Sequence, residues 1–279
     1  MNVEELLEKA LGLADEGDWS GMAEFLRDNL ADHDEEPAVQ CWLGVAEREL
    51  GMEGVAYERF RRAVTLGTED PYVLATAGAA LAIFDDPDAE TALRTAALLA
   101  PDLPLTRLMY GAYLAREGFH KEGLEELEAA RALDADDAQI AYELGAARML
   151  AGDADAAADA MGDAVSLDPE SGWYRVVLGL VLLEADREEE ALGELTEGAH
   201  LMPEDVEAQL LAALAACVTG REGLAYEMVE RARMRALEGD SALVTAVEDR
   251  VDGGADEARS MLVDALGPDS LRERLLERP

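Results

Sequence analysis

The sequence predicts an all-α solenoid of about eight repeats, each folded as two helices around a short turn. Three observations lead to this prediction. Small residues recur along the chain at intervals of 33 or 34 residues. Apolar residues between them follow the 3.6-residue period of a helix. Glycine or aspartate stands at the point where each helix pair must turn, so the whole chain reads as one repeated unit.

Three series of small residues keep the same register along the chain. The first lies in the first helix of each repeat and comprises Ala10, Gly44, Gly78, Gly111, Gly145, Gly179 and Ala213. The second follows twelve residues later as Met22, Ala56, Ala89, Gly123, Ala157, Ala191 and Ala225. The third follows after seven more as Asn29, Ala63, Ala96, Ala130, Ala164, Gly198 and Ala232. We expect these small side chains to let helices approach closely, with no catalytic role.

A turn position lies between the first two series. It is occupied by Gly17, Gly51, Asp85, Gly118, Gly152, Asp186 and Gly220. The single interval of 33 residues separates Gly78 from Gly111 in the first series and Ala56 from Ala89 in the second. The missing residue therefore lies between Gly78 and Ala89, and we place it in the loop around Pro87.

Each repeat is expected to contain two helices of about 13 residues. The repeats begin near Val3, Pro37, Pro71, Pro104, Ala138, Gly172, Val206 and Asp240. A proline ends the second helix at Ala100-Pro101, Asp168-Pro169 and Met202-Pro203, because proline restricts the residue before it and cannot continue the hydrogen-bond ladder. The first and last repeats are degenerate, as terminal capping repeats usually are.

The C-terminal stretch GPDSLRERLLERP predicts one more helix over residues 269–278. Ser270 and Glu273 have the spacing of a capping box, which precedes Leu271, Leu275 and Leu276. We expect this helix to cap the end of the solenoid. The alternative is a tail helix that folds back into the groove of the solenoid.

The pattern resembles the tetratricopeptide repeat (TPR) family, whose 34-residue unit carries a Leu-Gly pair, a turn glycine, alternating small and aromatic residues, and a closing proline. Leu43-Gly44, Leu144-Gly145 and Leu178-Gly179 match the pair, and Phe60 matches the aromatic of the second helix. The family's first-helix aromatic is replaced by Glu47, Leu81, Leu114, Arg148 and Leu182. The resemblance covers about residues 3–266. It implies a single right-handed superhelical solenoid over residues 1–279 and a role in protein binding.

In similar proteins, positions two, five, six and nine of each first helix line the concave groove, so the resemblance implies which residues contact a partner. They are Trp42, Val45, Tyr72, Leu105, Leu108, Met109, Tyr142, Trp173, Val176, Val177, Leu180, Leu210, Leu211 and Leu214. Family members that clamp acidic peptides place Lys, Arg and Asn there, and none occurs here. We therefore expect an apolar segment or an amphipathic helix as ligand. For the four aromatic residues, partner contact and packing within the chain stay equally open; for the aliphatic residues, core packing is favoured.

The predicted function is a non-catalytic protein–protein interaction scaffold that presents this apolar concave groove to a peptide or helix of a partner. The alternatives are a self-associating structural module, which would be a homo-oligomer, and a regulatory accessory subunit of an enzyme complex. We expect no catalytic site, metal or cofactor. The histidines His33, His120 and His200 lie in different repeats, and Asp153–Asp159 lacks the glycine and glutamate of a calcium loop. Nucleotide-binding and hydrolase motifs are also missing.

The charge excludes further classes of partner. The chain carries 62 acidic and 23 basic residues, a formal net charge of -39. Such a field repels nucleic acid phosphates and anionic membranes. With only Lys9 and Lys121 as lysines, the composition resembles that of proteins from salt-in halophiles such as halophilic archaea. The alternative explanation of the acidity is that it serves to bind one basic partner. The sequence has no long apolar run, so we expect no insertion into membranes. It has no signal-peptide pattern, and Cys41 and Cys217 lie far apart, so we expect a cytoplasmic protein.

Overall fold

The computed structural model describes residues 1–276, which form helices joined by short turns. The chain divides into two compact units. The N-terminal unit comprises residues 1–117 and 125–133, and the C-terminal unit comprises residues 118–124 and those from Asp134 onward. The boundary runs through one helix, and each unit is described by itself.

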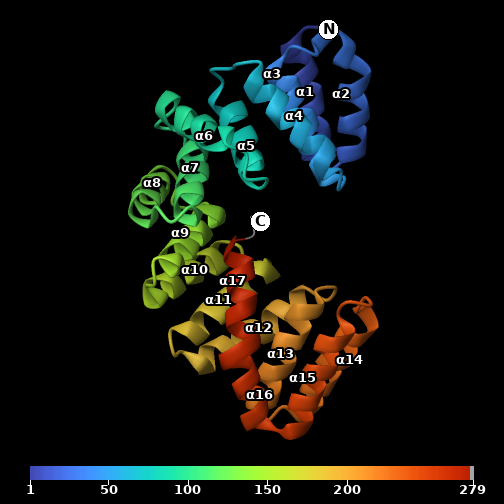
Figure 1. The fold of residues 1–279 in the computed structure, drawn as a ribbon, viewed down its shortest axis with the longest axis vertical. Helices are drawn as coiled ribbons and strands as arrows, with labels where there is room; N and C mark the ends of the chain where they lie inside the picture. Colours follow the sequence, from blue (N-terminus) through green and yellow to red (C-terminus); the bar gives the residue numbers. More distant parts are fainter. Residues whose placement is uncertain (277–279) are drawn as a thin grey trace. The chain divides into compact units, whose positions relative to one another are not determined.

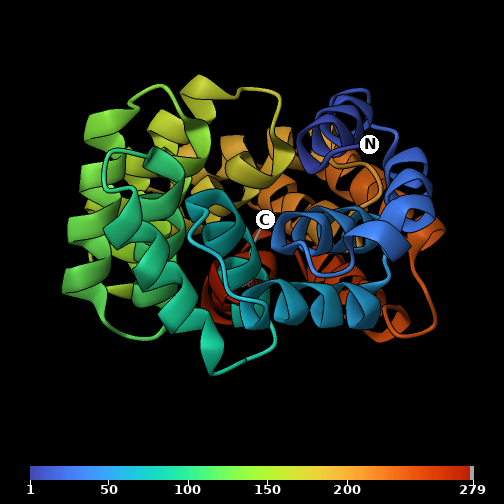
Figure 2. The same ribbon diagram turned by 90° about the horizontal axis from the view of Figure 1, so that it is seen from above.

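The N-terminal unit contains consecutive helices in pairs, drawn from blue to green in Figure 1. They are α1 (Val3–Asp15), α2 (Trp19–His33), α3 (Pro37–Glu49), α4 (Glu53–Thr65), α5 (Pro71–Ala82), α6 (Asp88–Leu99), α7 (Pro104–Arg116) and α8 (His120–Leu133), whose first residues belong to the other unit. Figures 1 and 2 show α1 to α4 packed side by side at the N-terminus.

The C-terminal unit continues the pairs and then departs from them. Its helices are α9 (Ala138–Leu150), α10 (Ala154–Leu167), α11 (Gly172–Glu184), α12 (Glu188–Leu201), α13 (Val206–Val218), α14 (Glu222–Arg235), α15 (Ser241–Gly253), α16 (Ala255–Met261) and α17 (Gly267–Leu276). A π-helical stretch, Leu262–Leu266, joins the last two without a break. The all-α repeat prediction is confirmed.

The first helices of the repeats begin where the sequence predicts, from Val3 of α1 to Val206 of α13. Proline occupies the first turn of α3, α5 and α7, where its missing N–H has no intrahelical partner to lose. Elsewhere a side chain caps the helix. Asp137, Ser171 and Asp205 accept hydrogen bonds from backbone N–H groups in the first turns of α9, α11 and α13. The predicted proline stops are also confirmed, because α6, α10 and α12 end at Leu99, Leu167 and Leu201.

The predicted turn position is confirmed by its backbone conformation. All seven of its residues have positive φ, including the two aspartates, Asp85 at 52° and Asp186 at 56°. This left-handed conformation is strained for residues with a Cβ atom and free of that strain for glycine. The conformation explains why glycine recurs there. The shortened repeat differs from the others at Asp85 to Asp88, immediately before α6, close to the predicted site at Pro87.

The prediction of an end-capping helix with a capping box at Ser270 is wrong. The chain is already helical from Ala255, so Ser270 lies inside a helix rather than at its start. The π-helical stretch precedes Pro268, which has no N–H and whose ring crowds the carbonyl four residues before it. The segment α16 to α17 runs back over α13 and then α11, and α17 lies along α11 in Figure 1. The tail-helix alternative fits these contacts. The predicted end of this helix at residues 277–278 lies outside the described residues.

Candidate functional site

In the N-terminal unit, the predicted partner-binding residues have unlike environments. Val45 and Leu108 are buried. Trp42 is half-buried and packs against two apolar clusters, and Leu105 and Met109 are half-buried against α5 and α6. Tyr72 is 49% exposed. Most of these side chains therefore contribute to packing between helices, and Tyr72 presents the largest apolar surface to solvent.

In the C-terminal unit, the structure brings the predicted residues together in one buried cluster. Tyr142, Val176, Val177, Leu180, Leu210, Leu211 and Leu214 are all buried in it, and Trp173 packs against it half-buried. The same cluster contains Leu262, Leu271 and Leu275 from the C-terminal segment. Residues predicted to line a groove thus pack in one core with a C-terminal segment of the same chain, which contacts α11 and α13.

The last helix of this segment, α17, packs on α11 and is amphipathic. Its buried residues are Gly267, Ser270, Leu271, Arg274 and Leu275, which recur at intervals of three and four and so lie on one face. Arg272, Glu273 and Leu276 on the other face are exposed. The hydroxyl of Tyr142 in α9 donates a hydrogen bond to the Arg274 carbonyl at 3.4 Å. The C-terminal segment therefore contacts α13, α11 and α9.

Arg274 makes the polar contacts of this interface, and its side chain is only 7% exposed. One guanidinium nitrogen, Nη2, lies 3.0 Å from Oδ2 of Asp205 and 3.3 Å from Oε1 of Glu207. The guanidinium also lies over the ring of Trp173, 4.8 Å from its centroid, within the range of a cation–π interaction. Ser270 links the two sides, because its hydroxyl donates to Glu207 and accepts from Nε of Arg274 at 3.2 Å.

Sequence reasoning included Trp173 but missed Asp205, Glu207 and Arg274. A signal for Glu207 was present, because it occupies position two of its repeat, in register with Tyr72, Leu105 and Trp173. Its carboxylate does not fit the apolar groove that the other positions predict. No sequence pattern indicated Arg274, since its partners lie 67 and 69 residues away in the chain.

Two stacked tyrosines extend the site toward α9. The rings of Tyr142 and Tyr174 lie 5.1 Å apart at an interplanar angle of 26°. Burial raises the pKa of Tyr174, and nearby Asp168 adds to the effect. Tyr174 therefore remains neutral at physiological pH, and the two stacked rings contribute apolar surface.

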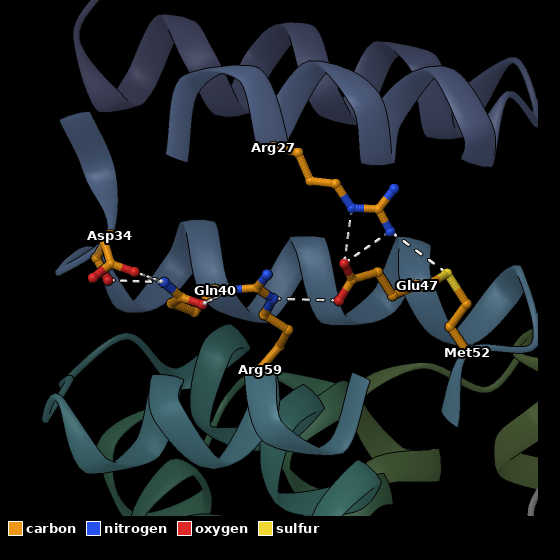
Figure 3. Close-up of polar contacts among 6 residues, drawn as sticks. All are labelled: Arg27, Asp34, Gln40, Glu47, Met52 and Arg59. Carbon is orange, nitrogen blue, oxygen red and sulfur yellow. Dashed lines mark hydrogen bonds and ion pairs between the residues drawn. The ribbon is translucent and has the colours of Figure 1, made fainter. Parts of the chain in front are cut away.

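A second polar cluster lies in the N-terminal unit (Figure 3). Glu47 of α3 is 1% exposed, and its carboxylate lies between Arg27 of α2, at 2.9 Å, and Arg59 of α4, at 3.3 Å. Gln40 donates to the Asp34 carbonyl at 2.8 Å and accepts from Arg59 at 3.2 Å. These contacts explain how an acid can replace the aromatic residue expected at position 47. We interpret the cluster as structural, since its charges are paired across three helices.

Among residues 1–276, no group of His, Cys, Asp and Glu side chains is arranged to hold a metal ion. In the same residues, none of the helices has the length and apolar character to cross a membrane. Cys41 and Cys217 are free and buried.

No protein-family model and no curated protein matches the sequence. Solved structures do match it. A structure of the APC/C hetero-tetramer Cut9–Hcn1 matches at 20% identity and a TM-score of 0.69, over 87% of this chain and 48% of that one, so this chain spans about half of that length. PilW, a type IV pilus biogenesis factor, matches at 16% identity and a TM-score of 0.61, over 73% of this chain and 96% of PilW.

TTC0263, a thermophilic TPR protein from Thermus thermophilus, matches at 21% identity and a TM-score of 0.56, over 64% of this chain and 98% of that one. At such identities a likeness bears on the fold alone. Together with the helix pairs and turns described above, it shows that this chain has the tetratricopeptide repeat fold.

Proposed function

We propose that the chain is a non-catalytic protein–protein interaction scaffold whose C-terminal unit binds an amphipathic helix of a partner protein. The observation that carries this proposal is α17 itself, an amphipathic helix that already lies on α11 with Leu271 and Leu275 buried. A surface that buries one such helix has the apolar side chains needed to bury another. The partner contacts would be the predicted residues of α9, α11 and α13, from Tyr142 and Trp173 to Leu214, which now pack with the segment from α16 to α17.

The fold adds support, because TPR proteins typically act as interaction scaffolds and the matching Cut9–Hcn1 structure is itself a hetero-tetramer. In the N-terminal unit, Tyr72 is the proposed partner contact with the most exposed ring. Trp42, Val45, Leu105, Leu108 and Met109 would support it. Binding as an accessory subunit of an enzyme complex is a special case of the same function.

We also propose that the chain works in the cytoplasm at high salt. The support is the net charge of -39 with two lysines in 279 residues. Molar salt shortens the range of like-charge repulsion to roughly 3 Å, so a compact fold with this surface is most stable there. A basic partner is the competing explanation.

The proposal is tested with the full-length chain in molar KCl. Leu271→Asp combined with Leu275→Asp undocks α17 by placing two charges on its buried face. Leu276→Asp is the matched control, because Leu276 is 54% exposed on the same helix. The probe is a fluorescein-labelled peptide with the sequence of residues 262–276, measured by fluorescence anisotropy.

We expect the double variant to bind the peptide, and the wild-type chain and Leu276→Asp to bind it at least about tenfold more weakly, because α17 occupies their site. A double variant with intact helicity that binds no peptide would overturn the proposal. Light scattering of the unsubstituted chain tests the alternative function. A dimer that dissociates when α17 is disrupted would favour the self-associating module instead.

A further inference from the structure

The contacts of Arg274 have the composition of a recognition site rather than of a chance surface pair. Two carboxylates and an indole ring converge on one guanidinium, at 3.0 Å, 3.3 Å and 4.8 Å. The arginine is nearly buried, whereas Asp205 and Glu207 keep 22% and 29% of their side chains exposed. An arginine that approached from outside would meet acceptors already in place.

The three receiving groups are held by the repeat framework and not by α17. Trp173 lies in the first turn of α11. Asp205 is the N-cap of α13, and its Oδ1 accepts from the backbone N–H of Ala208 at 2.9 Å while its Oδ2 faces Arg274. Glu207 lies in the first turn of the same helix. Each side chain thus starts from a helix terminus of the repeat framework. The Asp205 carboxylate is also held there by the Ala208 N–H, whereas the Glu207 carboxylate contacts Ser270 and Arg274 of α17.

The chemistry selects arginine over lysine. A helix N-terminus repels a cation, so the cation at the start of α13 requires the two carboxylates beside it. A planar guanidinium can stack on the indole while its edge donates to both carboxylates, which a lysine ammonium cannot match. The strongly acidic chain also attracts basic segments.

We propose that Trp173, Asp205 and Glu207 form an arginine-recognition site and that the partner's helix carries arginine where α17 carries Arg274. The partner sequence would follow the pattern of α17: serine and leucine at adjacent positions, then arginine and leucine four residues further on, as in Ser270-Leu271 and Arg274-Leu275. In the absence of partner, α17 occupies the site as an internal competitor. This inference rests on the proposed function and adds the chemical identity of its ligand.

The join between α16 and α17 suits such an exchange. The regular hydrogen-bond ladder is interrupted by the π-helical stretch at Leu262–Leu266 and by Pro268, which donates no backbone hydrogen bond. A β-carbon at Gly267 would overlap the Leu262 carbonyl oxygen, so the distorted path needs glycine there. The helix has a built-in weak point immediately before the residues that must detach.

The experiment uses the Leu271→Asp/Leu275→Asp chain and three labelled peptides of residues 262–276 in molar KCl. One has the natural sequence, one carries Arg274→Gln, and one carries Arg272→Gln. Arg272 is the matched control because its side chain is 69% exposed and pairs with Asp269 of the same helix. We expect Arg274→Gln to weaken binding by about tenfold or more, because it leaves two partly buried carboxylates without a cation. The Arg272→Gln change should alter the binding affinity of the peptide by less than about twofold.

A second arm places the change in the receptor. Glu207→Gln added to the double variant should weaken binding of the natural peptide by about tenfold. In that triple variant, the natural peptide and the Arg274→Gln peptide should bind with nearly equal affinity. Equal binding of all three peptides would overturn arginine recognition while leaving helix binding intact. Loss of binding by all three would instead be a failure of the proposed function, so the two failures are distinguishable.

Discussion

Gly145 of α9 packs directly against Met161 of α10: a β-carbon added at Gly145 would overlap Cγ of Met161 and lie 3.2 Å from the Ala157 carbonyl oxygen. This contact joins the first two series of small residues within one repeat. Gly78 against Leu93 and Gly179 against Leu195 repeat it in other pairs. The small residues therefore set the distance between paired helices.

Gly145→Ala should destabilise the chain by about 1–3 kcal/mol, because the added methyl group forces the helices apart or moves Met161. The matched control is Gly162→Ala on α10, where an added β-carbon meets no atom within 4 Å. At that position the better helix propensity of alanine should stabilise the folded chain by about 0.5–1 kcal/mol. Urea unfolding in molar KCl measures both changes, and the same sign for the two would contradict the packing argument.

Asp85→Gly and Asp186→Gly should each stabilise the chain by about 0.5 kcal/mol. Both aspartates are exposed and held at positive φ, and glycine relieves that strain at a cost in unfolded-state entropy. Gly152→Asp is the reverse control and should destabilise by about 1 kcal/mol. The midpoint of thermal unfolding reports each change. A lower midpoint for both glycine variants would mean that the aspartate side chains contribute more than the strain removes.

Glu47→Gln should destabilise the N-terminal unit by about 2 kcal/mol, because it leaves Arg27 and Arg59 without the charge that both contact. This destabilisation is smaller than that expected on breaking a fully buried ion pair, since the side chains of the two arginines are 40% and 24% exposed. The control is Glu90→Gln, whose pair with Arg94 is more than half exposed at 4.0 Å. It should change stability by less than about 0.5 kcal/mol. Equal effects in urea unfolding would contradict a structural role for Glu47.

The chain should lose stability as the pH rises above 9, in part through Cys41. Burial, with a smaller effect of Asp70, raises the pKa of this thiol from 9.0 to about 12. Between these values the folded chain keeps the proton that the unfolded chain releases, so the free energy of unfolding falls by about 1.4 kcal/mol per pH unit. Cys41→Ala should reduce that slope between pH 9 and 10. Tyrosines such as Tyr174 also have raised pKa values, but they contribute equally to both proteins. Identical slopes would count against the predicted role of the thiol.

Dialysis from molar KCl to about 0.1 M should melt helices, because the Debye length grows from roughly 3 Å to 10 Å and the net charge of -39 repels itself. Circular dichroism at 222 nm monitors the loss, and return of the signal on adding KCl shows reversibility. Cooperative unfolding with an unchanged midpoint at low salt would refute the halophile interpretation and leave the acidic surface to a basic partner.

One further repeated contact could have been predicted from the sequence and was not. The fourth residue of a first helix contacts a side chain 19 residues later in three repeats: Gln40 with Arg59, Arg107 with Glu126, and Arg175 with Glu194. The spacing is constant because it joins the two helices of one pair. One pair is Gln–Arg and two are Arg–Glu, so the residue types change between repeats while the geometry does not.

The candidate site was predictable in part. Positions two, five, six and nine were carried over from a resemblance, and in the C-terminal unit they do lie in one cluster. Whether such a cluster is open or covered depends on a helix that meets it from far along the chain. Tyr142 and Arg274 are 132 residues apart, and no local pattern at either residue indicates the other.

The sequence by itself determined the helix pairs, their starts, the left-handed turns and the close packing of small residues, because each depends on residues within one repeat. Backbone sterics act on the residue itself, and a helix pair places residues about 12 to 19 apart in contact. Only the tertiary structure decided that α17 covers α11 and that Arg274 meets Trp173, Asp205 and Glu207. The sequence predicted Ser270 as a helix cap, because Ser270 and Glu273 have the spacing of a capping box. The helix instead continues through a π-helical turn, because burial of Leu271, Arg274 and Leu275 against α11 and α13 stabilises the continued helix more than a local cap could.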